Sequence, residues 1–210
     1  MSYCQLDADG NFIRQVYGEV QEWDANNYCT VDALVKDGKA DQFRIVPLTP
    51  TDPPVINPLT QRVYRDGAEF IGGAWQYKWV VEALSAPAIA ANLAAARAAI
   101  HVTIKAERDR RKFNGVFVSG KLIHTDTYSR TQWMGMVMMG AGIPAIEWTT
   151  MDNTSITTSQ ALAGAVFQAT ATLDATLFGY AKGLIEAVNA SNDPSSIDIT
   201  TGWPATFEGA

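Results

Sequence analysis

The segment GVFVSGKLIHTD, residues 115–126, opens the stretch of sequence that decides the fold, and this stretch continues to Asn189. The Ser-Gly pair at 119–120 lies between two short runs of strand-forming residues, a pattern that predicts a β-hairpin closed by a two-residue turn. The turn sets two cross-strand pairs, one on each face: Phe117 with Leu122, and Val116 with Ile123.

A methionine-rich segment, WMGMVMM at residues 133–139, follows the hairpin. We expect a short helix here, running from Arg130 to about Met139 with Ser129 as its N-cap. Apolar side chains surround almost the whole circumference of this helix, so it would have to be covered on every side. Methionine most often fills gaps in a core or in an adaptable protein interface, and contact with a cofactor is the alternative.

The segment EWTTMDNTSI, residues 147–156, predicts a strand over 146–150 and a turn at 152–153, where the Asp side chain orders the backbone. Thr157 and Gln160 then have the spacing of a capping box, which predicts the start of a helix.

The long helix that follows has the clearest apolar stripe in the chain. The stripe consists of Leu162, Val166, Ala169, Leu173, Leu177, Tyr180, Leu184 and Val188. Three glycines, Gly164, Gly179 and Gly183, each weaken such a helix by up to about 1 kcal/mol relative to alanine, or they allow another helix to approach closely. The sequence from Ser191 onward is typical of a loop, for which Trp203 and Phe207 are the candidate anchors.

Upstream of the hairpin, an alanine-rich helix is predicted from Ser85, its N-cap, to about Phe113. Its narrow apolar stripe consists of Ile89, Leu93, Ala96, Ile100 and Ile104. At 1.5 Å per residue the helix would be roughly 40 Å long, more than a small domain needs for its own core. Packing on copies of itself and packing on the protein's own sheet both remain open.

The end of this helix carries the one basic cluster, KAERDRRK at residues 105–112. An RNA-binding arm is one interpretation. A solvated helix end is favoured, because Glu107 and Arg111 have the spacing of an ion pair and cations stabilise a helix C-terminus.

The first part of the chain reads as strands and turns. Asp9-Gly10 predicts a hairpin between strands at 3–6 and 12–17, and another strand is expected over 43–48. Asp66-Gly67 and Gly72-Gly73 would divide residues 62–82 into three extended pieces. In the third piece the aromatic residues Trp75, Tyr77 and Trp79 alternate onto one face with Val81; they fill a small core or, alternatively, form a platform for carbohydrate.

Together these elements predict an α+β protein in four parts. The parts are a small antiparallel β-rich domain (1–84), a connecting helix (85–113), an α+β domain with the hairpin and the long closing helix (114–190), and a C-terminal tail (191–210).

Composition limits the possible partners. The 210 residues include 16 Lys and Arg against 22 Asp and Glu, a net charge of -6, which argues against binding a phosphate backbone. Two cysteines, Cys4 and Cys29, are too few for a disulfide framework or a four-ligand zinc site. No signal peptide is evident and no run of about 18 apolar residues occurs, so we expect neither secretion nor a transmembrane span, and synthesis in a cytoplasm.

No constellation of residues points to catalysis. His124, Asp126 and Ser129 are close in sequence, but a triad gathers from separated positions and has an oxyanion hole beside its nucleophile. The chain has two histidines, and its glycines match no nucleotide-binding fingerprint. We therefore assign no catalytic, cofactor-binding or metal-ligating residue and expect a protein that is not an enzyme.

The order RRKFNGVFVSGKLIHTDTYSRTQW, then IEWTTMDNTSITTS, then a long alanine-rich helix resembles a domain of unassigned function common in tailed-bacteriophage tail and tail-fibre-associated proteins. The resemblance covers residues 110–190, and the segment NPLTQRVYRDGAEFIGGAWQYKWVVEALS is similar to N-terminal pieces of tail-fibre assembly and tail structural proteins.

The resemblance implies a virion structural protein of the tail tip, baseplate or fibre attachment, which contacts other tail proteins and forms a homo-oligomer, with a trimer preferred. A tail-fibre assembly chaperone is one alternative, and a receptor-binding or glycan-binding module is another.

Overall fold

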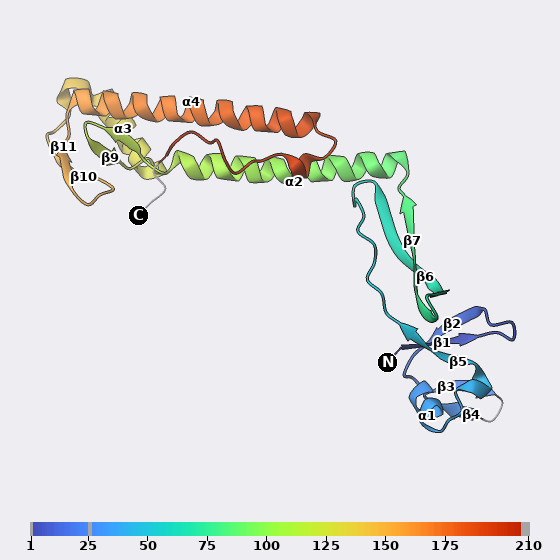
Figure 1. The fold of residues 1–210 in the computed structure, drawn as a ribbon. Helices are drawn as coiled ribbons and strands as arrows, with labels where there is room; N and C mark the ends of the chain where they lie inside the picture. The colour runs from blue at the N-terminus through green and yellow to red at the C-terminus, as the bar shows by residue number, and fades with distance from the viewer. Residues whose placement is uncertain (1, 25–26, 207–210) are drawn as a thin grey trace. The chain divides into compact units, whose positions relative to one another are not determined.

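The computed structural model describes residues 2–24 and 27–206 (Figure 1). The fold is α+β, as predicted, with a mainly antiparallel sheet in the N-terminal part and long helices in the C-terminal part. The chain divides into two compact units, Met1–Ile89 and Ala90–Ala210.

The first unit is built on a five-stranded sheet with the order β2-β1-β5-β7-β6. All neighbouring strands are antiparallel except β5 and β7, which are parallel. The strands are β1 (Ser2–Leu6), β2 (Phe12–Val16), β5 (Ile45–Thr49), β6 (Gln61–Ile71) and β7 (Ala74–Ala83). The β1–β2 hairpin confirms the prediction at Asp9-Gly10, where Gly10 adopts a φ of 84°.

Asp66-Gly67 is not a turn, which corrects the prediction of three extended pieces. β6 continues through it, and the register with β7 shifts between Arg65 and Ala68, as in a β-bulge. Gly67 has a φ of 76°, and a Cβ there would lie 2.8 Å from the ring of Phe12. Positive φ and a close neighbour both require glycine at this bulge.

Residues 21–43 form short elements beside the sheet. They are β3 (Gln21–Asp24), β4 (Asn27–Cys29), α1 (Val31–Lys36) and the 3-10 turn η1 (Asp41–Phe43). Thr30 caps α1 by accepting a hydrogen bond from the Ala33 N–H. Because η1 occupies the start of the predicted strand over 43–48, β5 begins two residues later. Two small apolar clusters fill this unit, one around Tyr3 and Ile45 and one around Cys4 and Leu48.

The predicted alanine-rich helix is α2 (Ala86–Lys112), and most of it belongs to the second unit. Ser85 Oγ accepts a hydrogen bond from the Ala88 N–H at 3.4 Å, which confirms the N-cap. Among the residues of its stripe, only Ile104 is fully buried and the others are half-buried.

The hairpin after α2 has the predicted register. β8 (Val116–Val118) pairs with β9 (Lys121–Ile123), and the turn residues Ser119 and Gly120 have φ values of 52° and 76°. Positive φ at both positions is the geometry of a type I′ turn, whose twist matches that of the paired strands.

The two helices that follow begin at residues other than those predicted from the sequence. α3 (Thr127–Met139) is capped by Asp126, whose carboxylate accepts from the N–H groups of Tyr128 and Ser129, so Ser129 is not the cap. α4 (Gln160–Ala190) is capped by Ser159, since Thr157 belongs to a strand. That strand, β11 (Ser155–Thr157), pairs with β10 (Glu147–Thr149) across the turn predicted at 152–153, where Asn153 has a φ of 57°.

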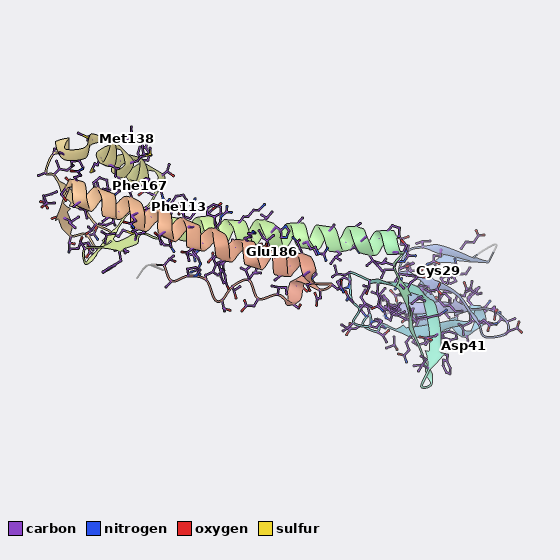
Figure 2. All side chains as sticks on the ribbon, turned by 90° about the horizontal axis from the view of Figure 1, so that it is seen from above. Cys29, Asp41, Phe113, Met138, Phe167 and Glu186 are labelled. Carbon is purple, nitrogen blue, oxygen red and sulfur yellow. The ribbon has the colours of Figure 1, made fainter. Side chains whose placement is uncertain are left out.

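In the second unit, α2 and α4 lie side by side and antiparallel, and the C-terminal segment runs back along one side of the pair (Figures 1 and 2). The predicted stripe of α4 contributes to two apolar clusters. One joins α4 to α3 and the β8–β9 hairpin around Trp133 and Val166, and the other joins α4 to α2 around Leu177 and Ile104. Trp203 is buried in the second cluster and anchors the C-terminal segment, which confirms one of the two predicted anchors; the other, Phe207, lies outside the described residues.

Candidate interaction surface

The exposed sides of α4 carry almost no charge. Between Gln160 and Ala181 the one charged residue is Asp174, which pairs with Arg130. A Cβ added to Gly164, Gly179 or Gly183 would meet nothing within 4 Å. No other element of the described chain therefore lies against these glycines. The close approach of another helix, one of the two interpretations given for them, does not occur within the described residues.

One side of α4 presents small residues at alternating spacings of four and three. We call this the small-residue flank, and it consists of Ala165, Ala169, Thr172, Thr176, Gly179 and Gly183. It borders an open groove of about 970 Å³ whose other walls are the β8–β9 hairpin and the C-terminal segment around Pro204. Such spacing places the side chains in one continuous row along the helix.

The outward side of α2 has the same character. Its exposed residues are alanines and one valine, and we call them the alanine face: Ala91, Ala94, Ala95, Ala98 and Val102. Val102 is 68% exposed. Arg97 is the one charged residue between Ala86 and Ile104, and it points to the C-terminal segment, where it donates to the Ser191 carbonyl. This helix therefore exposes to water roughly four turns of apolar surface that carries no charged side chain.

The methionines of α3 lie largely at the surface. Trp133 is buried against Trp148, with ring centroids 4.6 Å apart, but Met138 is 82% exposed. Met134, Val137 and Met139 are exposed as well. The prediction that this helix is covered on every side is therefore wrong within this chain, and Figure 2 shows Met138 and Phe167 at the same end of the helical unit.

A cavity of about 290 Å³ opens between α3 and α4. Its walls are mostly apolar, with a few polar groups among them; they are formed by His124, Arg130, Thr131, Trp133, Met134, Phe167, Thr170, Ala171 and Asp174. The buried indole N–H of Trp133 has no hydrogen-bond partner among the described residues. A recess of this size accommodates one large side chain or a small molecule.

Arg130 joins the elements around this cavity. Its guanidinium donates to both carboxylate oxygens of Asp174, at 2.7 and 3.0 Å, and to the backbone carbonyls of Thr125 and Lys112. The residue thereby connects α3 to α4 and to the end of α2. A bidentate, charge-assisted pair of this kind fixes both distance and orientation.

The basic cluster lies at the C-terminal end of α2, as predicted, but it is less solvated than expected, because the side chains of Arg108, Arg111 and Lys112 are largely covered. Glu107 accepts from Arg110 and from Arg111, the i,i+4 partner that was predicted. The hydrogen bond from Arg110 is the main reason that the pKa of Glu107 falls to about 2. Arg108 lies over the ring of Phe178, with its guanidinium carbon 4.2 Å from the ring centroid, and Lys112 lies 5.2 Å from the same centroid.

The three residues that invite a triad interpretation are arranged as a helix cap. Ser129 Oγ donates to the Asp126 carboxylate at 2.6 Å, and this bond, with those from the backbone, lowers the pKa of Asp126. His124 lines the cavity instead.

In the part of the chain that the structure describes, no group of three or more His, Cys, Asp or Glu side chains could hold a metal ion. Both cysteines are free, and burial raises the pKa of Cys4 to about 11.

Residues 95–201, which comprise most of the helical unit, match the sequence family described as Domain of unknown function (DUF4376). The chain belongs to this family. No curated protein and no solved structure matches it. The DUF4376 region contains the whole of α3 and α4 and the later part of α2, and so includes most of the uncharged surface.

Both long helices of the DUF4376 protein meet the length and composition of a membrane span. The sequence-based expectation of no span used a stricter criterion, an unbroken apolar run. Length and composition alone are weak evidence, because helices of soluble proteins also satisfy them. Both helices meet the criterion of length and composition because α2 and α4 contain few charged residues over most of their length.

The aromatic residues of β7 have partners in the sheet unit. The indole N–H of Trp79 donates to the Thr51 carbonyl, and Arg65 lies over the ring of Tyr77 at 4.5 Å. Trp75 packs at a tilt against Phe70, with centroids 5.7 Å apart. The three rings are half-buried and contribute to packing, which is the first of the two interpretations given for them.

Proposed function

We propose that this DUF4376 protein is a non-enzymatic structural component of a larger assembly and that it acts through protein–protein contacts of its helical unit. The observation that carries the proposal is the uncharged, exposed surface of α2 and α4, namely the alanine face and the small-residue flank. Exposed apolar surface of this extent is typical of interaction sites, and the cores of protein interfaces are poor in charged residues.

The spacing of the small residues suits helix-on-helix packing. In the alanine face, residues 91, 95, 98 and 102 alternate by four and three, and the small-residue flank has the same alternation. This is the spacing of a coiled-coil seam. Small side chains let helix backbones approach closely, and the absence of charge avoids the free-energy cost of removing an ion from water.

A second copy of the chain is the occupant that we propose for these surfaces. Each copy has two different strips, so the alanine face of one copy can pack on the small-residue flank of the next. Such a contact is heterologous, and it forms a closed ring when the rotation between neighbours closes. We propose a homotrimer as the closed form.

The wider setting that we propose is a bacteriophage tail, at the tail tip, baseplate or fibre attachment. Support for this setting comes from the resemblance of residues 110–190 to tail-associated domains. A tail-fibre assembly chaperone is the second candidate, because exposed methionines such as Met134 and Met138 suit the adaptable binding of a folding partner. Soluble yield of a co-expressed fibre subunit that depends on this chain would favour the chaperone, and presence of the chain in purified particles would favour the structural role.

The test is a matched pair of substitutions, Val102→Glu and Val55→Glu. Val102 is 68% exposed in the alanine face, and Val55 is fully exposed in a loop of the sheet unit. Glutamate is a good helix former, so neither change should unfold the chain. We expect Val102→Glu to convert the oligomer to monomer and Val55→Glu to leave it intact, as measured by light scattering after size exclusion. Equal masses for the two variants, or a chain that stays in solution only with detergent, would overturn the proposal.

A further inference from the structure

The side of α4 away from the small-residue flank carries a second surface of different composition. Phe167, Ala171, Asp174 and Phe178 are spaced by four, three and four residues and so share one face of the helix. We call this surface the apolar–basic strip. Its apolar end consists of Met134, Met138 and Phe167. Its basic end consists of Arg108 and Lys112, which lie over the ring of Phe178, and of Lys105, which precedes Arg108 by about one turn of α2.

The apolar end is built around the cavity of about 290 Å³ between α3 and α4. Met134 and Phe167 line its mouth and are 49% and 48% exposed, and Trp133 at its wall is 2% exposed with an unpartnered indole N–H. An apolar recess of this kind can receive a single large side chain, and the indole N–H in its wall can donate a hydrogen bond to an acceptor of the incoming segment.

The middle of the strip is electrically balanced. Asp174 lines the cavity and is neutralised by the bidentate bonds of Arg130. Lys112 Nζ lies 3.9 Å from the carboxylate of Asp174, so the basic end of the strip starts beside the cavity.

The basic end therefore keeps an excess of positive charge. Lys105, Arg108 and Lys112 recur at spacings of three and four on one flank of α2. Arg108 is balanced by Asp109, but Lys105 is exposed and Lys112 shares Asp174 with Arg130. A partner that matches the whole strip thus has apolar side chains at one end and carboxylates at the other.

We propose that the apolar–basic strip binds an amphipathic segment of another protein, whose apolar anchor enters the cavity between Met134 and Phe167 and whose acidic residues meet Lys105, Arg108 and Lys112. The charge pattern of the strip selects this class of partner and sets its direction along α4. Because the strip and the small-residue flank lie on opposite sides of the buried stripe of α4, a second copy on that flank leaves the strip open.

A membrane rich in anionic lipid would also meet apolar and basic groups, but it presents a flat surface. The recess beside Trp133 favours a partner that projects one side chain into it. Vesicles of phosphatidylglycerol therefore enter the test as a competing outcome.

The probe is a fluorescent synthetic peptide with a leucine-rich helical face followed by glutamates. Two companion peptides replace the glutamates by lysines or the leucines by alanines. Fluorescence anisotropy with the full chain should give saturable binding of the first peptide, with affinity that falls as salt is added, and much weaker binding of both companions. No saturable binding of the first peptide, or equal binding of all three, would overturn the proposal.

Two variants locate the site. Phe167→Ala should weaken binding about tenfold, whereas Phe70→Ala, which removes an equally large exposed ring from β6 of the sheet unit, should not change it. Lys105→Glu should weaken binding of the glutamate peptide and strengthen that of the lysine peptide, a reversal that loss of folding cannot produce. Equal losses in the two phenylalanine variants would refute the assignment, as would sedimentation with phosphatidylglycerol vesicles that is stronger than peptide binding.

Discussion

The β6–β7 hairpin of the sheet unit and α4 of the helical unit both expose large apolar side chains, but they differ in the charges that accompany them. The hairpin carries two exposed ion pairs, Arg62 with Glu82 and Lys78 with Asp66. α4 has no exposed charge over roughly six turns before Lys182. We therefore expect the hairpin surface to remain in water and the helix surface to contact another protein.

The same contrast applies to the ion pairs themselves. Arg62 and Glu82 are about half exposed or more, whereas Arg130 and Asp174 are largely screened from water. Arg130 also donates to two backbone carbonyls. Its removal would take away both hydrogen bonds to the Asp174 carboxylate and the bond to the Thr125 carbonyl, whereas the Lys112 carbonyl would keep the bond that Thr125 Oγ1 donates.

We expect Arg130→Ala to have the largest effect, a loss of about 3 kcal/mol in the free energy of unfolding of the helical unit. Arg62→Ala should cost under about 1 kcal/mol, because exposed pairs contribute little. Urea unfolding followed by circular dichroism at a helix-sensitive wavelength measures both. Similar losses for the two variants would show that the Arg130 pair is no more important than a surface pair.

A smaller effect is expected at the start of α4. Ser159→Ala removes the acceptor for the Leu162 N–H and should cost about 1 kcal/mol. Thr157→Ala, at the position that the capping-box pattern selects, should cost less, because Thr157 lies in β11 and its hydroxyl donates to exposed Glu147. The same urea titration measures the loss of stability in both variants. A larger loss for Thr157→Ala would show that Thr157 is the N-cap of α4, as the capping-box pattern predicted.

The smallest effect concerns the pH dependence of the helical unit. The pKa of Glu107 is lowered from 4.5 to about 2, so this carboxylate stabilises the fold fully above about pH 4.5 and loses its contribution as the pH falls toward 2. Glu107→Gln should flatten the acid side of the stability profile by about 1 kcal/mol or less, since arginine pairs at the surface are screened. An unchanged profile would exclude Glu107 as a source of that dependence.

The long, regular patterns of the sequence predicted the fold well. The stripe of α4, the N-cap of α2 and the register of the β8–β9 hairpin each depend on local chemistry, and each was confirmed. The errors fell where tertiary contacts decide between two local options. Asp66-Gly67 can form a turn or a bulge, and its place within the long β6–β7 pairing selects the bulge.

The candidate surface was only partly predictable. Methionine content singled out α3, but the sequence gives no sign of which methionines are covered, because that depends on where α4 packs. The cavity beside Trp133 and the role of Arg130 arise from residues far apart in the chain, such as Lys112 and Asp174, which no local pattern connects. The shortage of charge on α2 and α4 could have been read from the sequence as a signal of association.

We propose that other copies of this chain cover the uncharged faces of α2 and α4. Sedimentation velocity of the unmodified protein over a range of concentrations tests it most directly. We predict a species of defined mass, three times the 22.8 kDa of the chain, that persists on dilution. A mass of 22.8 kDa at every concentration, in a folded and soluble protein, would contradict the account.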